Sequence, residues 1–313
     1  MRTLLRGALL SAMLFSGFLV VGAEQRGRGG PSGPPEPTPR LADGTVNLGR
    51  VAGEKGVWSV PYITNMGERI VAPDGTTVFE TRMASMRGRG PGGGRGAGAP
   101  LGGGEGAAGG ARGGAKSEPQ VPFLPWAAGI YNYNSSNNSK YDPEGYCLPP
   151  GGPRMMATPY PMEIVQLPEQ RRIFMVFEGA THTWREIYMD GRRHPEGDAL
   201  NPTYLGHSVG RWEGDTLVVD VVGFNEGTWI DYYGHPHTDL LHVVERISRP
   251  DKSTLRYEAT IDDSGAYTRP WTVSWNIPWN PTGELTEYIC QENNRYLWNL
   301  TDDLGQPIFG PRP

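Results

Sequence analysis

The sequence predicts an all-β protein whose strands form an antiparallel meander that closes into a lipocalin-like or calycin-like β-barrel. Apolar and polar residues alternate over short runs, turn residues separate the runs, and no helical period is convincing. Closing the meander removes exposed strand edges, so a barrel is favoured over the alternative, a β-sandwich. The 313 residues include 45 Gly and 29 Pro, but 9 Trp and 14 Tyr supply ample bulk for a core.

Segments of distinct composition precede the predicted barrel. Residues 1–23 have two arginines, an apolar stretch and a small-residue end, which is the pattern of a secretory signal peptide. Residues 24–40 predict a disordered leader, 41–86 a partly ordered segment and 87–117 a Gly-rich disordered insertion, because glycine offers little surface to bury. The barrel is expected over residues 118–313. These features predict a periplasmic or secreted protein without stable membrane insertion.

Three successive hairpins are expected in the barrel wall, each made of two alternating runs around a short turn. The paired runs are residues 172–178 with 182–190, 205–212 with 216–223, and 240–249 with 254–262. Further strands are expected at residues 268–277 and 284–291.

The register of each hairpin decides which polar side chains enter the barrel, because a shift of one residue turns every side chain to the other face. In the first hairpin, Arg185 shares a face with apolar residues. In the second, a turn that places Trp212 opposite Thr216 sends His207 to the apolar, inward face. Basic side chains among apolar neighbours predict a ligand site inside the barrel.

The third hairpin is predicted with Arg249 opposite Thr254. In this register His242 and Arg246 face inward, and Arg246 lies opposite Tyr257. The three hairpins therefore each contribute a basic side chain to the interior.

All six histidines lie between residues 182 and 242, which is the strongest functional signal in the sequence: His182, His194, His207, His235, His237 and His242. The loop sequence His235-Pro236-His237 places two imidazoles on one side of an extended backbone, a common arrangement for metal ligands. With His242, or alternatively His207, they predict a three-His site for one divalent transition metal, namely zinc, copper, iron or manganese. A metal-free acid–base site and ordinary loop and core histidines are the two alternatives.

Carboxylates near these histidines are candidates to orient an imidazole, and the three considered are Asp231, Asp239 and Glu245. Alternation points Glu245 outward, which makes it the weakest of the three. His194 is expected in an exposed turn apart from the site. Because no dinucleotide fingerprint or phosphate-binding loop occurs, no nucleotide cofactor is expected.

Cys147 and Cys290 are the two cysteines of the chain. Since an exported protein folds under oxidising conditions, they are expected to form a disulfide. Two free, buried thiols are the alternative.

Several motifs of the chain resemble those of a large family of secreted bacterial proteins. They lie at residues 147–154, 206–220, 234–238 and 266–271, and read CLPPGGPR, GHSVGRWEGDTLVVD, GHPHT and AYTRPW. The resemblance covers about residues 126–294. It implies a single exported module with a disulfide, and it supplies neither a reaction nor a catalytic residue.

Together these observations predict an exported enzyme with a His-lined site at the barrel mouth. It would perform metal- or His-assisted hydrolysis or elimination on a small polyhydroxylated or aromatic substrate. The expected catalytic residues are His207, His242 and Asp231.

The expected substrate-binding residues are Arg185, Arg246, Tyr257 and Trp229, with the arginines holding an anionic group or a developing oxyanion. The alternative is a non-catalytic, lipocalin-like protein that binds a small ligand. A net charge of −5 argues against binding to a nucleic-acid backbone.

Overall fold

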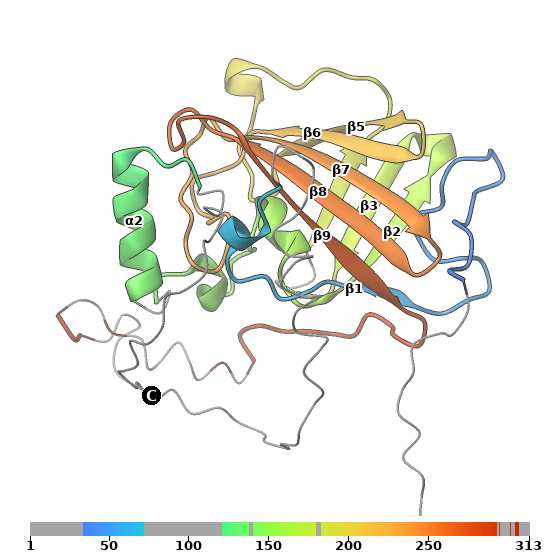
Figure 1. Ribbon diagram of the computed structural model, residues 1–313, viewed down its shortest axis with the longest axis horizontal. Helices are drawn as coiled ribbons and strands as arrows, with labels where there is room; N and C mark the ends of the chain where they lie inside the picture. The colour runs from blue at the N-terminus through green and yellow to red at the C-terminus, as the bar shows by residue number, and fades with distance from the viewer. Residues whose placement is uncertain are drawn as a thin grey trace, which may run out of the picture. The chain divides into compact units, whose positions relative to one another are not determined.

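The computed structural model describes residues 34–71, 121–137, 140–179, 183–292, 294, 301 and 304–306. The expected signal peptide, the Gly-rich insertion and His182 lie outside these residues. Within them, nine strands form a closed barrel in chain order, which confirms the predicted fold class (Figure 1). The short strand β1 (Val57–Ser59) closes the ring, because it pairs with both β2 (Pro161–Leu167) and β9 (Trp271–Asn280).

The wall between β2 and β9 is built from three pairs of strands. These are β3 (Arg172–Phe177) and β4 (Trp184–Tyr188), β5 (His207–Glu213) and β6 (Thr216–Val222), and β7 (His242–Asp251) and β8 (Thr254–Asp262). The three predicted hairpin segments and the run at residues 268–277 therefore contain strands. Residues 284–291 form no strand, and β2 was not predicted.

Within the described part of the chain, short helices connect the strands, and one α-helix lies beside the barrel. The 3-10 helices are η1 (Met66–Arg69), η2 (Pro143–Tyr146), η3 (Gly152–Met156), η4 (Pro168–Gln170) and η5 (Gly197–Ala199). Helix α2 (Pro125–Ser136) buries only Ala127 and Asn134, so its sequence has no apolar period by which to predict it. None of the described helices combines the length and the apolar character needed to cross a bilayer.

The barrel interior is packed with large apolar side chains. Among the fully buried ones are Trp58, Phe177, Met162, Met175, Ile187 and Leu217. They come from alternating positions of the strands, as the predicted faces of β3, β6 and β8 require. A ligand therefore has to bind elsewhere than the centre of this core.

Arg249 binds the backbone of residues 47–49 at one end of the barrel. Its guanidinium lies 4.8 Å from the ring centre of Trp58 and 5.4 Å from that of Trp279. It donates to the carbonyl oxygens of Asn47 and Gly49, each at 2.7 Å. Burial lowers the pKa of Arg249 to about 10. The group therefore stays charged at neutral pH, stabilised by carbonyl dipoles and aromatic faces.

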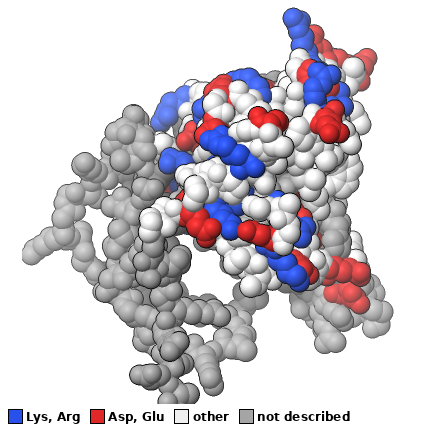
Figure 2. All heavy atoms as spheres, turned by 90° about the vertical axis from the view of Figure 1, so that its right-hand side faces the viewer, with Lys and Arg blue, Asp and Glu red and all other residues white. Residues whose placement is uncertain are grey.

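The charged surface mixes both signs. Figure 2 shows basic and acidic side chains interspersed over the face that looks to the right in Figure 1. Exposed ion pairs of the described surface include Arg40–Asp215 at 2.6 Å and Lys252–Glu54 at 2.9 Å. Such pairs contribute little to stability, because solvent screens them.

The register of the second hairpin differs from the prediction by one residue. Its loop holds only Gly214 and Asp215, so Glu213 pairs with Thr216, and Gly214 has a left-handed φ of 60°. The prediction that His207 faces inward was therefore wrong, and its inward neighbour is the buried Ser208.

The register of the third hairpin also differs from the prediction by one residue, and here a β-bulge contributes. Asp251 pairs with Thr254 across a two-residue loop, and a β-bulge lies between Ser248 and Asp251. His242 and Arg246 consequently point outward, whereas Glu245 points inward and is 1% exposed. The predicted faces of all three residues were wrong.

One strand pair interrupts the antiparallel meander. Strands β4 and β5 run parallel and share only the pairs Ile187↔Ser208 and Tyr188↔Val209. A parallel neighbour requires the chain to return to the start of the strand, and residues 189–206 make this connection. The first half of β4 therefore has no strand partner on this side, and the barrel wall opens there.

The expected disulfide is present between Cys147, which follows η2, and Cys290, which lies beyond β9. It closes a loop with a sequence separation of 143, for which the chain-entropy model gives at most about 5 kcal/mol. However, most residues from 281 to 292 are exposed, so this segment can detach without unfolding the barrel.

We expect the double variant Cys147→Ser/Cys290→Ser to lose less than about 2 kcal/mol of global stability, because the bond chiefly constrains this peripheral segment. Amide hydrogen exchange should nevertheless accelerate over residues 281–292 while the strands stay protected. A loss near the full loop-closure value, with uniformly faster exchange, would show that the segment unfolds together with the barrel.

Candidate functional site

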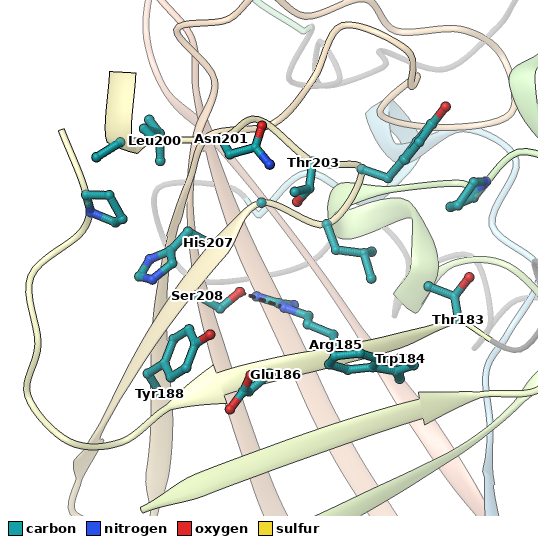
Figure 3. A pocket seen from close by; sticks show the side chains of 16 residues that line it. Thr183, Trp184, Arg185, Glu186, Tyr188, Leu200, Asn201, Thr203, His207 and Ser208 are labelled. Carbon is teal, nitrogen blue, oxygen red and sulfur yellow. Dashed lines mark hydrogen bonds between the residues drawn. The ribbon is translucent and has the colours of Figure 1, made fainter. Parts of the chain in front are cut away.

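A pocket of about 510 Å³ lies where the barrel wall opens between β4 and β5. Its sides come from the first half of β4, from the 189–206 connection and from the start of β5. In Figure 3, Arg185 and Ser208 point toward each other at its base, with His207 and Tyr188 at one end and Trp184 at the other. A cavity of this size accommodates a small molecule.

The base of the pocket rests on a buried ion pair. Arg185 of β4 donates from Nη1 and Nη2 to the two carboxylate oxygens of Glu245 of β7, at 3.0 and 2.5 Å. The hydroxyl of Tyr257 donates to the same carboxylate at 2.6 Å. Burial opposes the charge of Arg185, but Glu245 outweighs it and raises the pKa of Arg185. The guanidinium is charged, and a carboxylate neutralises it within the protein.

Ser208 joins this network at the pocket surface. The Nε–H of Arg185 donates to the Ser208 hydroxyl oxygen at 2.9 Å. Since this contact occupies the oxygen as an acceptor, the hydroxyl proton of Ser208 is left to donate to another group. Ser208 lines the pocket, so a bound molecule can receive that hydrogen bond.

His194, His207 and His242 form a cluster with Asp220 at the outer face of β5, β6 and β7, and His194 comes from the 189–206 connection. The Asp220 Oδ1 atom lies 3.0 Å from His194 Nε2 and 3.1 Å from His242 Nε2. The Nδ1 atom of His194 in turn lies 2.8 Å from that of His207. His194 is therefore no isolated turn residue, contrary to the prediction. His207 also lines the pocket, so the chain Asp220–His194–His207 ends at the pocket wall.

The order of these contacts assigns the protons of the neutral cluster. Ionised Asp220 can only accept, so His194 must carry its proton on Nε2. The bare Nδ1 of His194 then accepts the Nδ1–H of His207, and the lone pair of His207 remains on Nε2. Burial lowers the pKa of His207, and His194 and Arg192 lower it further. The lowered pKa favours the neutral form of His207, whose lone pair in this arrangement lies on Nε2.

The ring of Tyr188 supports His207 from below. The two rings stack with centres 5.1 Å apart and planes 25° apart. Arg192 lies over the same tyrosine ring at 3.8 Å, and Asp190 neutralises Arg192 through a 2.7 Å contact. These contacts hold the imidazole at the end of the pocket.

The three predicted metal ligands lie in three different environments. His235 is buried, stacks on Phe123 and places Nδ1 at 2.7 Å from Asp231. His237 contacts the Thr228 hydroxyl at 2.8 Å through Nε2. His242 instead contacts Asp220, so the described contacts do not bring the three together. Among the residues that the structure describes, no group of three His, Cys, Asp or Glu could hold a metal ion.

Asp231 stabilises the 223–241 loop and does not line the pocket. Its buried carboxylate accepts backbone N–H groups of Met66 at 2.7 Å and Gly234 at 3.1 Å. Burial raises its pKa, but His235 and the backbone donors outweigh this effect, so the pKa of Asp231 is lowered. The carboxylate therefore ties the loop to η1 and to His235.

The other predicted site residues are dispersed. Arg246 is exposed and donates to Glu213 at 2.9 Å, and Asp239 is also exposed. Trp229 is half-buried in the 223–241 loop, away from the pocket lining, and Tyr257 lies in the barrel interior behind Arg185. Of the predicted site residues, Arg185 and His207 line the pocket.

Sequence reasoning missed Ser208, Asp220 and Trp184. Asp220 and Ser208 occupy ordinary alternating positions, and their partners come from other strands. Only the correct register could have identified them. Trp184 begins β4 and is 59% exposed at the pocket, a signal visible only once the wall opens.

Comparisons with family models, with curated proteins and with solved structures find no match for this chain. The resemblance to secreted bacterial proteins therefore rests on its sequence motifs alone.

Proposed function

We propose that this protein is an exported enzyme in which His207 acts as a general base in the pocket between β4 and β5. The reaction class is hydrolysis of, or elimination from, a small molecule. The observation that carries the proposal is the chain Asp220–His194–His207, with contacts of 3.0 and 2.8 Å. These contacts use Nδ1 of His207, so Nε2 is the basic atom of this pocket-lining residue.

In hydrolysis, His207 Nε2 would take one proton from water as the water oxygen bonds to an electrophilic substrate carbon. The bond from that carbon to the leaving group breaks, and the leaving group takes the proton back from Nε2. While His207 carries the proton, its Nδ1–H donates to His194, whose own Nε2–H donates to Asp220. The carboxylate thus stabilises the positive charge through the intervening ring.

Ser208 would contribute in the same step. Its available hydroxyl proton can donate to a carbonyl oxygen that becomes negative in the transition state. Arg185 fixes the Ser208 oxygen at 2.9 Å, so this donor is oriented before the substrate binds.

The proposal requires His207 to carry its proton on Nδ1, the less common tautomer of a free imidazole. We expect nitrogen-15 spectra at pH 7.5 to show a protonated Nδ1 and a bare Nε2 for His207, assigned with His207→Gln. His194 should show the opposite tautomer, because it donates from Nε2 to Asp220. In Asp220→Asn this preference should weaken. A protonated Nε2 on His207 in the wild-type protein would overturn its role as a base.

A binding protein without turnover is the second candidate. The observation that favours it is Trp184, which is 59% exposed at the pocket and can cover an aromatic or sugar ring. Retention of a small molecule through purification, together with no turnover above that of free imidazole, would favour this candidate.

A further inference from the structure

We infer that the pocket selects uncharged ligands that carry a hydrogen-bond acceptor, such as a carbonyl oxygen, next to a planar ring. This inference concerns the same pocket as the proposed function, but it depends on recognition and not on turnover.

The first argument is the neutralised charge at the base. Arg185 is the basic residue that a ligand would meet there, yet Glu245 already engages both of its terminal nitrogens. The pair is 5% and 1% exposed, so it cannot rearrange into solvent to free the guanidinium. An entering carboxylate would lose its hydration and gain no opposite charge.

The second argument is the charge of the walls. Glu186 lines the pocket and accepts from Arg172 at 2.6 Å, so this pair too is neutral overall. The base therefore presents the Ser208 hydroxyl as a polar donor, and Arg185 holds its oxygen in place. A neutral acceptor satisfies this donor without an unpaired charge.

The third argument is the shape of the walls. Trp184, Tyr188 and Tyr204 line the pocket, together with the apolar side chains of Leu200 and Leu205. Trp184 is largely exposed. Thr183, Asn201 and Thr203 add polar side chains to the lining. Aromatic and apolar walls beside the Ser208 donor match a small ring with an acceptor substituent.

Benzamide and benzoate test this inference, because they share a ring and a size but differ in charge. We expect benzamide to bind the full-length protein at least about tenfold more tightly than benzoate at pH 7.5, as measured by ligand-observed NMR. Ser208→Ala should weaken benzamide binding about tenfold, because it removes the donor. Trp184→Ala should weaken it as well, and Arg246→Gln, on the outer surface, is the matched control.

Glu245→Gln provides the converse change, because it keeps the shape of the side chain and removes its charge. We expect this variant to bind benzoate more tightly than the wild-type protein does. If it fails to fold, Ser208→Ala still decides. Tighter binding of benzoate than benzamide, binding of neither, or full benzamide binding in Ser208→Ala would overturn the inference.

The two proposals fail separately. Selective benzamide binding by a protein whose His207 has a protonated Nε2 would refute only the role of His207 as a general base. The expected His207 tautomer with preferred benzoate binding would refute only the ligand class.

Discussion

Replacing Glu245 by leucine should lower the free energy of unfolding by about 3–5 kcal/mol, the cost of leaving a buried charge without its partner. The variant keeps Arg185 in an environment where it is 5% exposed, and it removes both carboxylate contacts. It also removes the acceptor of the Tyr257 hydroxyl. Urea unfolding followed by tryptophan fluorescence measures the change.

A double variant separates the unpaired charge from lost packing. Arg185→Met/Glu245→Leu replaces both ions by apolar groups of similar size and should recover more than half of the loss, because no buried charge remains. Tyr257→Phe should cost only about 1–2 kcal/mol, since the ion pair stays intact. If the double variant were as unstable as both single variants together, the two side chains would not be coupled.

Replacing His207 by glutamine should reduce hydrolysis of 4-nitrophenyl acetate by about 100-fold or more, the usual contribution of a positioned general base. The wild-type protein should also exceed the rate of an equal concentration of free imidazole. Release of 4-nitrophenolate, followed by absorbance, measures both rates. Wild-type turnover no faster than imidazole would contradict the hydrolase.

Variants of the other cluster residues test the order of the contacts. His194→Gln should cause a smaller loss than His207→Gln, because it removes only the support of the base. His242→Gln touches Asp220 without lying between it and His207, so its effect should be smaller still. Arg246→Gln, exposed on the outer surface, is the control for an unchanged rate. Equal losses at His207 and His242 would reject the assigned order.

The pH dependence follows from the lowered pKa of His207. A base acts in its neutral form, so the rate should be constant above this pKa and fall about tenfold per unit of pH below it. Because burial lowers this pKa, the inflection should lie below the ordinary value of 6.5. Asp220→Asn should lower it further, since the carboxylate favours the charged imidazole.

The alternation of apolar residues alone predicted the barrel, the inward position of Arg185 and the inward faces of β6 and β8. Alternation suffices there because burial of one face has the same sequence signature wherever the strand lies. The pairing of Cys147 with Cys290 also followed from the sequence, because no other cysteine competes.

The faces of His207, His242 and Glu245 depended on the tertiary structure. Two-residue loops and one β-bulge shifted the register, and a shift of one residue exchanges the inward and outward sets. The strands that carry these residues are polar enough at alternate positions for either face to seem plausible. Their partner strands, β6 and β8, leave no such choice between the two faces, and the inward faces of β6 and β8 were predicted correctly.

By itself the sequence determined an all-β barrel with a disulfide and a concentration of histidines between residues 182 and 242. Only the tertiary structure decided that β4 and β5 run parallel, and hence that the wall opens beside Arg185. It also brought Asp220, His194 and His207 into one chain of contacts. Pairing direction and long-range contacts depend on how distant strands pack, and local periodicity carries no record of that packing.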